Sequence, residues 1–317
     1  MVKLVIQIPC FNEEQALGVT LDSLPRALAG VDEIEVLVVD DGSTDRTVEV
    51  ARAHGVRHFV RFPRNRGLAA AFAAGLNAAL ALGADAIVNT DADNQYRADD
   101  IANLIAPILD GSAEIVVGAR PIAEVEHFSR AKKILQALGS WVVRIASGTD
   151  VADAPSGFRA FSRHAAMRMN VFGDYTYTLE TIIQAGQRNM AIASVPVRVN
   201  PDLRPSRLIR SVPSYVWRSG QTILRVLIVY RPLRFFAVLS LPFLLVGTLL
   251  VLRFAYFYAI GDGNGHVQSL QIGTFAGLTG VFLMAFGVLA DLIAANRRLL
   301  EDIKLRLWEV EDRLGKK

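Results

Sequence analysis

Two long apolar segments near the C-terminus constrain the fold of this chain more than any other feature. They run from Phe235 to Ile260 and from Ile272 to Ala295. Each is long enough to cross about 30 Å of hydrocarbon as a helix, and both exceed the usual length of a helix in a soluble core. A buried helical hairpin is the alternative. Because 52% of the chain is hydrophobic, which is high for a soluble protein, we predict two transmembrane helices, residues 235–260 and 272–295.

The distribution of arginines around these segments predicts their orientation. Arg231, Arg234, Arg297 and Arg298 flank the outer ends of the pair, whereas the connecting loop, residues 261–271, contains no Lys or Arg. Cytoplasmic loops carry the excess of positive charge. The first residues of the chain also lack the order of basic, apolar and small residues that marks a secretory signal. We therefore expect an integral membrane protein with its N-terminal domain and both termini in the cytoplasm.

Basic and apolar residues are mixed on both sides of the predicted hairpin. Residues 206–231 predict an amphipathic helix attracted to anionic lipid, with an ordinary basic linker helix as the alternative. Residues 297–317 form the predicted cytoplasmic tail. Its apolar residues alternate at steps of three and four, as in a coiled coil: Leu300, Ile303, Leu307, Val310 and Leu314. This spacing predicts a homo-oligomer, or a tail that packs on the N-terminal domain or on the membrane.

The first 205 residues have the pattern of an α/β domain. Short β-branched apolar runs alternate with Ala- and Leu-rich stretches from residue 2 to about residue 120, and a further run lies near residues 191–199. This alternation is typical of a largely parallel sheet covered by helices. The net charge of +3 is too small to favour a nucleic-acid partner. The single cysteine, Cys10, excludes an internal disulfide.

Two carboxylates follow directly after one of the predicted strands. Asp91 and Asp93 come after the apolar run Ala86–Thr90, and ligands of open α/β sheets bind beyond the carboxyl ends of the strands. Carboxylates one residue apart can hold a hard divalent cation whose other ligands are water and phosphate oxygens. An Asp-x-Asp pair also occurs in turns and helix caps. In this position the pair predicts a Mg²⁺ or Mn²⁺ site for a leaving diphosphate.

Polar residues also end the first two predicted strands, at the same edge of the sheet. Pro9, Phe11 and Glu13 follow the first strand, and Asp40 and Asp41 end the second. The acidic side chains can accept hydrogen bonds from a nucleobase N–H and from ribose hydroxyls, while Pro9 and Phe11 provide an apolar wall. These segments therefore predict a site for a nucleoside.

Helix capping is a second role for the same segments. Asn12 is a candidate cap for the first helix, and Ser43 or Thr44 is a candidate cap for the second. Capping and nucleoside binding are compatible. Gly67 ends a third segment, before an Ala-rich helix, at a point where glycine permits close approach of a ligand to the backbone.

Taken together, these motifs resemble the GT-A glycosyltransferases of family 2. The resemblance spans about residues 2–200 and is closest to the dolichol-phosphate mannose synthases and the bacterial enzymes that charge undecaprenyl phosphate. The motifs that carry it are P-C-F-N-E-E, V-V-D-D-G-S-T-D, N-R-G, D-A-D-N-Q, V-V-G-A-R and S-G-F-R. The resemblance implies a GT-A fold, a nucleotide-sugar donor and a polyprenyl phosphate acceptor at the cytoplasmic face of a membrane, such as the bacterial inner membrane.

The resemblance also implies roles for individual residues of these motifs. The residues that would bind the divalent cation and the donor diphosphate are Asp91, Asp93 and Gln95. The residues that would form the nucleoside pocket are Pro9, Glu13, Asp40, Asp41 and Gly67. Arg120 would bind a phosphate, a role that suits the two-pronged geometry of a guanidinium.

A second cation is expected to help Arg120. The candidates are Arg130, Lys132 and Lys133. The sequence leaves the choice among them open, and we include Lys133 in the candidate site. Surface charge without a specific role is the alternative for all three.

The remaining candidates belong to the acceptor side and to a segment that covers the donor in relatives. Asp153, with Asp150 as its competitor, is the candidate carboxylate near the reacting carbon, and Glu180 is the candidate acidic base. Arg204 and Arg207 lie in the segment that would close over the donor, or they bind the lipid phosphate.

The predicted reaction is inverting transfer of a hexose from a UDP- or GDP-sugar to polyprenyl phosphate. A phosphate monoester with a second pKa of about 6 is already largely a dianion at neutral pH, so the acceptor needs no general base. Transfer to another lipid or glycan, and a catalytically silent membrane scaffold, are the alternatives. A processive synthase is disfavoured because no Gln-x-x-Arg-Trp motif is present, and a dehydrogenase because no Gly-x-Gly-x-x-Gly follows the first strand.

Overall fold

The chain forms two units, Met1–Ile223 and Leu224–Lys317. The computed structural model describes residues 1–121, 140–141, 143–144, 147–171, 177–200, 220–221, 224–225 and 228–315. The predicted amphipathic helix, residues 206–231, and the boundary at residue 205 therefore fall largely outside the described residues and stay predictions.

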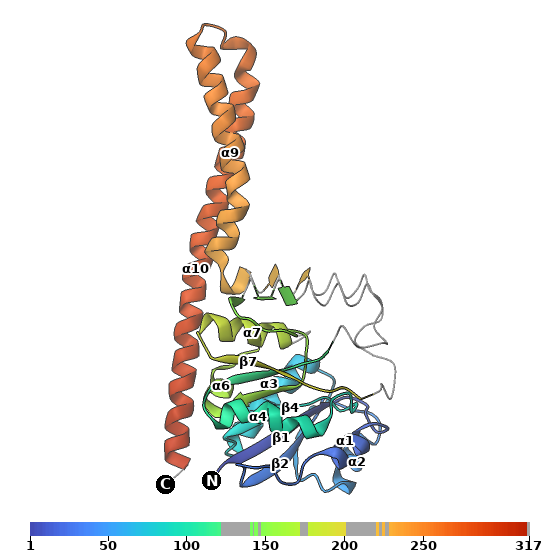
Figure 1. Ribbon diagram of the computed structural model, residues 1–317. Helices are drawn as coiled ribbons and strands as arrows, with labels where there is room; N and C mark the ends of the chain where they lie inside the picture. Colours follow the sequence, from blue (N-terminus) through green and yellow to red (C-terminus); the bar gives the residue numbers. More distant parts are fainter. Residues whose placement is uncertain are drawn as a thin grey trace. The chain divides into compact units, whose positions relative to one another are not determined.

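The N-terminal unit contains a seven-stranded sheet (Figure 1). Its strands are β1 (Lys3–Cys10), β2 (Glu33–Asp40), β3 (His58–Arg61), β4 (Ala86–Asn89), β5 (Ile115–Ala119), β6 (Arg159–Ser162) and β7 (Ile192–Pro196). They are arranged in the order β3-β2-β1-β4-β6-β5-β7. All neighbouring pairs are parallel except those of β6, which runs antiparallel to both β4 and β5. The predicted α/β fold with a largely parallel sheet is confirmed.

Strand β6 was not predicted from the sequence. It has only four residues and begins with Arg159, the last residue of the Ser-Gly-Phe-Arg motif. The side chain of Arg159 is nevertheless fully buried. A charged residue in so short a segment conceals the alternation of apolar residues by which a strand is recognised, so only the tertiary structure shows that it belongs to the sheet.

Helices pack on both faces of the sheet (Figure 1). They are α1 (Leu17–Ser23), α2 (Thr47–Ala53), α3 (Leu68–Ala81), η1 (Ala98–Asp100), α4 (Ile101–Leu109), α6 (Arg163–Arg168) and α7 (Thr178–Gln187). Successive side chains of a strand point to opposite faces. Leu4, Ile6 and Ile8 of β1 therefore share one apolar cluster with residues of α1 and α4. Gln7 points to the other face, where it lies against Gly75 of α3.

The C-terminal unit contains two long helices, α9 (Pro232–Ala259) and α10 (Val267–Gly315), joined by the short helix η2 (Asn264–His266). The segments Pro232–Ala259 and Val267–Arg297 are long and apolar enough to cross a membrane. Only 11% and 17% of their most apolar 18-residue stretches are buried within the protein. The two long apolar helices predicted from the sequence are thus confirmed. Because water would hydrate so much exposed apolar surface unfavourably, a bilayer is the environment that suits them.

Glycine allows α9 and α10 to approach closely. A side-chain carbon placed at Gly247 of α9 would lie 2.6 Å from the backbone nitrogen of Gly277 of α10, and one placed at Gly273 would lie 2.9 Å from the side chain of Leu250. Small residues at a helix interface let backbones pack together in lipid, where no hydrophobic effect drives association. The hairpin therefore depends on these glycines.

The predicted tail is a continuation of α10 to Gly315. Ile303, Leu307 and Val310, which belong to the predicted coiled-coil seam, have exposed fractions of 55%, 59% and 52%. An exposed apolar stripe of this kind is compatible with a partner helix, and self-association stays a prediction.

Candidate active site

The carboxyl ends of β1, β2 and β4 meet at one edge of the sheet. Cys10 at the end of β1 pairs with Asp40 at the end of β2, and Gln7 of β1 pairs with Asn89 at the end of β4. The chain order reverses at β1, because β2 lies on one side of it and β4 on the other. Ligands of open α/β sheets bind in the crevice at such a reversal. The segments singled out in the sequence are therefore neighbours in space.

Asp41 connects the loop after β2 to the loop before α3. Its carboxylate accepts hydrogen bonds from the backbone nitrogens of Arg66 (2.7 Å) and Gly67 (2.9 Å). Gly67 has φ of +92°, a left-handed conformation that glycine adopts without strain. Burial raises the pKa of the Asp41 carboxyl, and the two backbone bonds act in the opposite direction. Asp41 and Gly67, which were both assigned to the nucleoside pocket, are thus in direct contact.

Asp40 is fully buried beside Asp41 and shapes the turn that follows β2. It accepts hydrogen bonds from the backbone nitrogen of Ser43 (2.8 Å) and from Nε of Arg61 (3.2 Å). At Gly42, φ is +73°, and a side-chain carbon there would lie 2.5 Å from the backbone of Arg64. Only glycine fits this turn, so the Asp-Asp-Gly motif is required for the local fold.

The end of β1 and the segment after it place three predicted nucleoside-pocket residues along the same edge. Pro9 is within β1 and pairs with Val39 of β2. Phe11 is 39% exposed and Glu13 is 9% exposed. The backbone nitrogen of Glu13 donates to the hydroxyl of Thr47, at the start of α2 (2.8 Å). The exposed ring of Phe11 therefore lies at a surface beside two acidic segments.

Asn12, Ser43 and Thr44 do not cap α1 or α2, and that prediction was wrong. The caps of α1 and α2 are Ala16 and Arg46, and neither makes a side-chain capping bond. Instead, the backbone nitrogen of Asn12 donates to the hydroxyl of Ser43 (2.9 Å), and the side-chain oxygen of Asn12 accepts from the backbone nitrogen of Thr44 (2.8 Å). Adjacent parallel strands bring the two loops together, so their polar groups satisfy each other.

A buried polar network lies directly beneath the Asp-x-Asp loop. The side-chain oxygen of Asn89 accepts from Gln7 (2.9 Å), and its amide nitrogen donates to the hydroxyl of Tyr177 and to the carbonyl of Gly157 (both 2.8 Å). The ring of Tyr177 stacks on Phe72 with centroids 3.7 Å apart. Buried polar groups of this kind specify one arrangement when they are paired. The network therefore fixes the end of β4, from which the loop starts.

The three residues assigned to the metal and diphosphate lie on this one loop. A side-chain carbon placed at Gly157 would lie 3.0 Å from both carboxylate oxygens of Asp91, so the absence of a side chain there makes room for that carboxylate. The carboxylate of Asp93 accepts from the backbone nitrogen of Gln95 (3.2 Å). All three residues are partly exposed. Among the described residues, no group of three His, Cys, Asp or Glu side chains is arranged to hold a metal.

Arg120 and Asp153 form a buried ion pair. Nε and Nη2 of Arg120 donate to the two carboxylate oxygens of Asp153 (2.7 and 3.1 Å), and the backbone nitrogen of Arg120 donates to the same carboxylate (3.3 Å). The side chains are 9% and 1% exposed. Burial lowers the pKa of Arg120, but Tyr96, Asp153 and Asp91 outweigh that effect and raise it above its ordinary value. The arginine is therefore held in one orientation near the Asp-x-Asp loop.

Arg159 of the Ser-Gly-Phe-Arg motif holds the loop that contains Asp153. Its guanidinium donates to the carbonyls of Ala154, Ser156 and Thr178 and to the hydroxyl of Thr181. Burial lowers the pKa of Arg159 to about 10, so the group remains charged at neutral pH. Its contacts are all internal, which makes it a structural residue.

Glu180 is buried in the first turn of α7. Its assignment as an acidic base is not tested by this position. Lys133, Arg204 and Arg207 lie outside the described residues, as do Arg130 and Lys132. Their roles stay predictions.

The residues that support the site were not predicted from the sequence. Asn89, Tyr177 and Gly157 were not assigned roles, although they hold the strand end and the space beside Asp91. The one available signal was Asn89 itself, a polar residue within the apolar run of β4. A polar side chain at a fully buried strand position needs a partner, but the sequence does not show which one.

Comparisons with known proteins identify the family. Residues 5–175, more than half of the chain, match the family described as Glycosyl transferase family 2. The chain is 29% identical over 215 residues to the UDP-N-acetylglucosamine–dolichyl-phosphate N-acetylglucosaminyltransferase of Methanococcus voltae, a match that covers 60% of this chain and 83% of the relative. It is 27% identical over 200 residues to the undecaprenyl-phosphate mannosyltransferase of Micrococcus luteus, covering 60% and 80%.

A solved structure supports the fold. This chain is similar to glucosyl-3-phosphoglycerate synthase from Mycobacterium tuberculosis, crystallised with Mn²⁺, uridine diphosphate and glucosyl-3-phosphoglycerate. The TM-score is 0.56 at 22% identity, covering 72% of this chain and 79% of that chain. The predicted GT-A fold is confirmed. Because residues 5–175 also match the family model, this chain belongs to glycosyl transferase family 2.

Proposed function

We propose that this glycosyltransferase moves a hexose from a UDP- or GDP-sugar to polyprenyl phosphate at the cytoplasmic face of a membrane. The observation that carries the proposal is the combination of a family 2 fold with two long apolar helices. Relatives of similar sequence are named for dolichyl phosphate and undecaprenyl phosphate as acceptors. An enzyme anchored by such helices is held at the surface where a lipid phosphate is available.

The residues of the Asp-x-Asp loop fit a divalent cation. Asp91 and Asp93 offer carboxylates from one loop, and Gln95 adds an amide. Mg²⁺ is commonly bound through one or two carboxylates together with substrate phosphates and water, so a third acidic ligand is not needed. When bound, Mg²⁺ or Mn²⁺ would neutralise charge on the leaving diphosphate.

The chain's own residues supply positioning and charge. Asp40, Asp41 and Glu13, which we assign to the nucleoside pocket, lie at the edge of the sheet, and Phe11 provides exposed apolar surface beside them. Arg120 is oriented by Asp153, which suits the binding of a phosphate oxygen near the loop. Preorganised cationic groups stabilise charge that develops in the transition state.

An oxygen of the acceptor phosphate attacks the anomeric carbon in a single displacement, as the bond from that carbon to the nucleoside diphosphate breaks and the diphosphate leaves. Its second pKa of about 6 makes it largely a dianion at neutral pH, so it needs no base. Asp153 then orients Arg120. Glu180 orients the acceptor or the sugar hydroxyls, and neither carboxylate removes a proton from the nucleophile. This route inverts the anomeric configuration, and a product with retained configuration would contradict it.

Transfer of radiolabelled sugar into organic-extractable lipid tests the proposal. The full chain, purified in detergent, is incubated with undecaprenyl phosphate, Mn²⁺ or Mg²⁺, and a panel of UDP- and GDP-sugars. We expect a lipid product that is lost with EDTA and in Asp93→Asn. Asp99→Asn is the matched control, because Asp99 is a 67% exposed carboxylate on the same stretch, paired with Arg97, and should leave transfer unchanged.

The outcomes separate the proposal from its alternatives. If the full chain unfolds cooperatively on heating, and is therefore folded, but gives no lipid product with any donor, that result would contradict polyprenyl phosphate as the acceptor. Product from a different lipid or glycan would redirect the acceptor assignment. Transfer that is insensitive to EDTA would contradict the metal site.

A further inference from the structure

The segment after β7 returns to the Asp-x-Asp loop and pairs with it. Val199 forms an antiparallel bridge with Tyr96. The backbone nitrogen of Arg97 donates to the carbonyl of Arg198 (3.2 Å), and the backbone nitrogen of Asn200 donates to the carbonyl of Gln95 (2.8 Å). Residues about a hundred positions apart in the sequence are thus joined in a short antiparallel ladder. We call the residues 198–200 the clamp.

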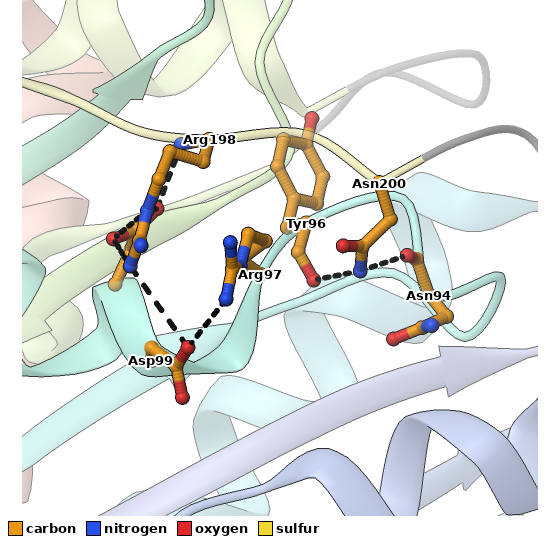
Figure 2. A network of polar contacts seen from close by, with 7 residues as sticks. Asn94, Tyr96, Arg97, Asp99, Arg198 and Asn200 are labelled. Carbon is orange, nitrogen blue, oxygen red and sulfur yellow. Dashed lines mark hydrogen bonds and ion pairs between the residues drawn. The ribbon is translucent and has the colours of Figure 1, made fainter.

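The side chain of Asn200 adds a contact that a backbone ladder does not provide. Its amide nitrogen donates to the carbonyl of Asn94 (2.9 Å) and approaches the carbonyl of Tyr96 (3.5 Å). Figure 2 shows Asn200 reaching across to both. Asn94 has φ of +56°, a left-handed conformation in which asparagine is enriched among residues other than glycine. The bond from Asn200 therefore acts on the residue at which the loop turns into this conformation.

Arg198 anchors the other end of the clamp. Its side chain donates from Nη2 and Nε to Asp100 (2.6 and 3.0 Å), and its backbone nitrogen donates to the same carboxylate (2.7 Å). Asp100 has a side chain that is 3% exposed and lies at the start of α4. Because Arg198 is bonded to the residue that caps α4, the backbone that carries Asn200 is held against the core. Figure 2 shows Arg198 and Asn200 on either side of Tyr96.

The clamp affects the predicted metal site because of where Asn94 lies in the loop. Asn94 lies between Asp93 and Gln95, two of the residues assigned to the metal and the donor diphosphate. A rotation of the peptide at Asn94 would move the backbone of both neighbours. The hydrogen bond from Gln95 to the carboxylate of Asp93 would change with it.

We propose that Asn200 is a positioning residue, which holds the backbone at Asn94 so that Asp93 and Gln95 present their side chains to a divalent cation and a nucleoside diphosphate. This inference rests on the proposed function for the identity of the ligand. Asn200 touches neither ligand itself. It holds the loop in its binding conformation before the ligand arrives. Less conformational entropy is then lost on binding, so the affinity is higher.

Binding of Mn²⁺ with UDP or GDP to the full chain in detergent tests the proposal, with free Mn²⁺ measured by electron paramagnetic resonance. Loss of one hydrogen bond should weaken Mn²⁺ binding about fivefold to tenfold in Asn200→Ala. The value of kcat at saturating Mn²⁺ and donor should stay near that of the wild type. Arg97→Ala is the matched control, since its exposed side chain pairs only with Asp99 among the bonds described, while its backbone bond in the clamp is kept.

Hydrogen–deuterium exchange provides a readout that does not depend on ligand. In Asn200→Ala, the backbone amides of Arg97 and of residue 200 should exchange faster than in the wild type, whereas the amides of β1 and β4 should keep wild-type protection. Retained protection in those strands shows that the variant is folded.

Three results would overturn the proposal. Wild-type Mn²⁺ affinity in Asn200→Ala, despite faster exchange of the loop, would show that the clamp does not position the ligands. An equal loss of affinity in Arg97→Ala would show that any truncation on this loop has the same effect. A wild-type protein that binds no Mn²⁺ with either nucleotide would instead defeat the proposed metal site, and the role of Asn200 with it.

Discussion

Replacing Asp153 with Asn tests the buried ion pair on which the orientation of Arg120 depends. The carboxylate is 1% exposed and accepts two bonds from the Arg120 side chain, at 2.7 and 3.1 Å. Asn keeps the shape and one oxygen, but it removes the charge and one acceptor. A hydrogen bond to a charged group contributes about 1.5–3 kcal/mol. We therefore expect the N-terminal unit to lose about 2 kcal/mol of unfolding free energy.

Thermal unfolding of the detergent-purified chain measures this loss. For a unit of roughly 150–250 residues, each kcal/mol shifts Tm by about 2–4 °C, so Asp153→Asn should lower Tm by about 4–8 °C. Asp150→Asn is the matched control, because its side chain is 99% exposed and lies 3.7 Å from Arg144. Surface pairs contribute about 0–1 kcal/mol, and the control should shift Tm by at most a few degrees.

Two results would refute the reasoning. If Asp153→Asn unfolds at the wild-type temperature, the pair does not hold Arg120 in place. If Asp150→Asn lowers Tm as much as Asp153→Asn does, the loss follows from negative charge in this loop and not from the buried pair.

Three further predictions follow from packing, charge and burial. Gly247→Leu should destabilise the hairpin by about 1–3 kcal/mol through overpacking, whereas Gly277→Ala should not, since a side-chain carbon there meets nothing within 4 Å; thermal unfolding in detergent compares them. Burial raises the pKa of Asp100, but bonds from Arg198 outweigh it and lower that pKa. Its stabilisation is therefore present above pH about 4 and lost below, so unfolding of Asp100→Asn should depend less on pH between about 5 and 3. Cys10 is buried, which raises its thiol pKa, and maleimide should label it only after unfolding.

Much of the site was predictable because its residues follow strands. Asp40, Asp41 and Asp91 come directly after apolar runs, and parallel strands bring their carboxyl ends to one edge. Local pattern therefore located the loops that later proved adjacent. The roles of Asn12 and Ser43 were predicted wrongly for the same reason: a sequence shows which residues are near a helix start, but not which loop lies beside it.

Residues that act across long separations were not predictable. Asn89 bonds to Tyr177, and Asn200 bonds to Asn94, over 88 and 106 positions. Arg120 and Asp153 were assigned separate roles, on a phosphate and near the reacting carbon, yet they form one ion pair. A pairing of this kind depends on the order of the strands and on which side chains share a face of the sheet. The spacing of residues along the sequence determines neither.

The sequence by itself determined the α/β class, the two long apolar helices, and the acidic loops at strand ends, because periodicity and local composition are short-range properties. Only the tertiary structure decided that β6 inserts antiparallel between β4 and β5, that Gly157 leaves room for Asp91, and that the chain after β7 returns to the Asp-x-Asp loop. These features arise from contacts between distant segments, whose free energies are set by packing in three dimensions.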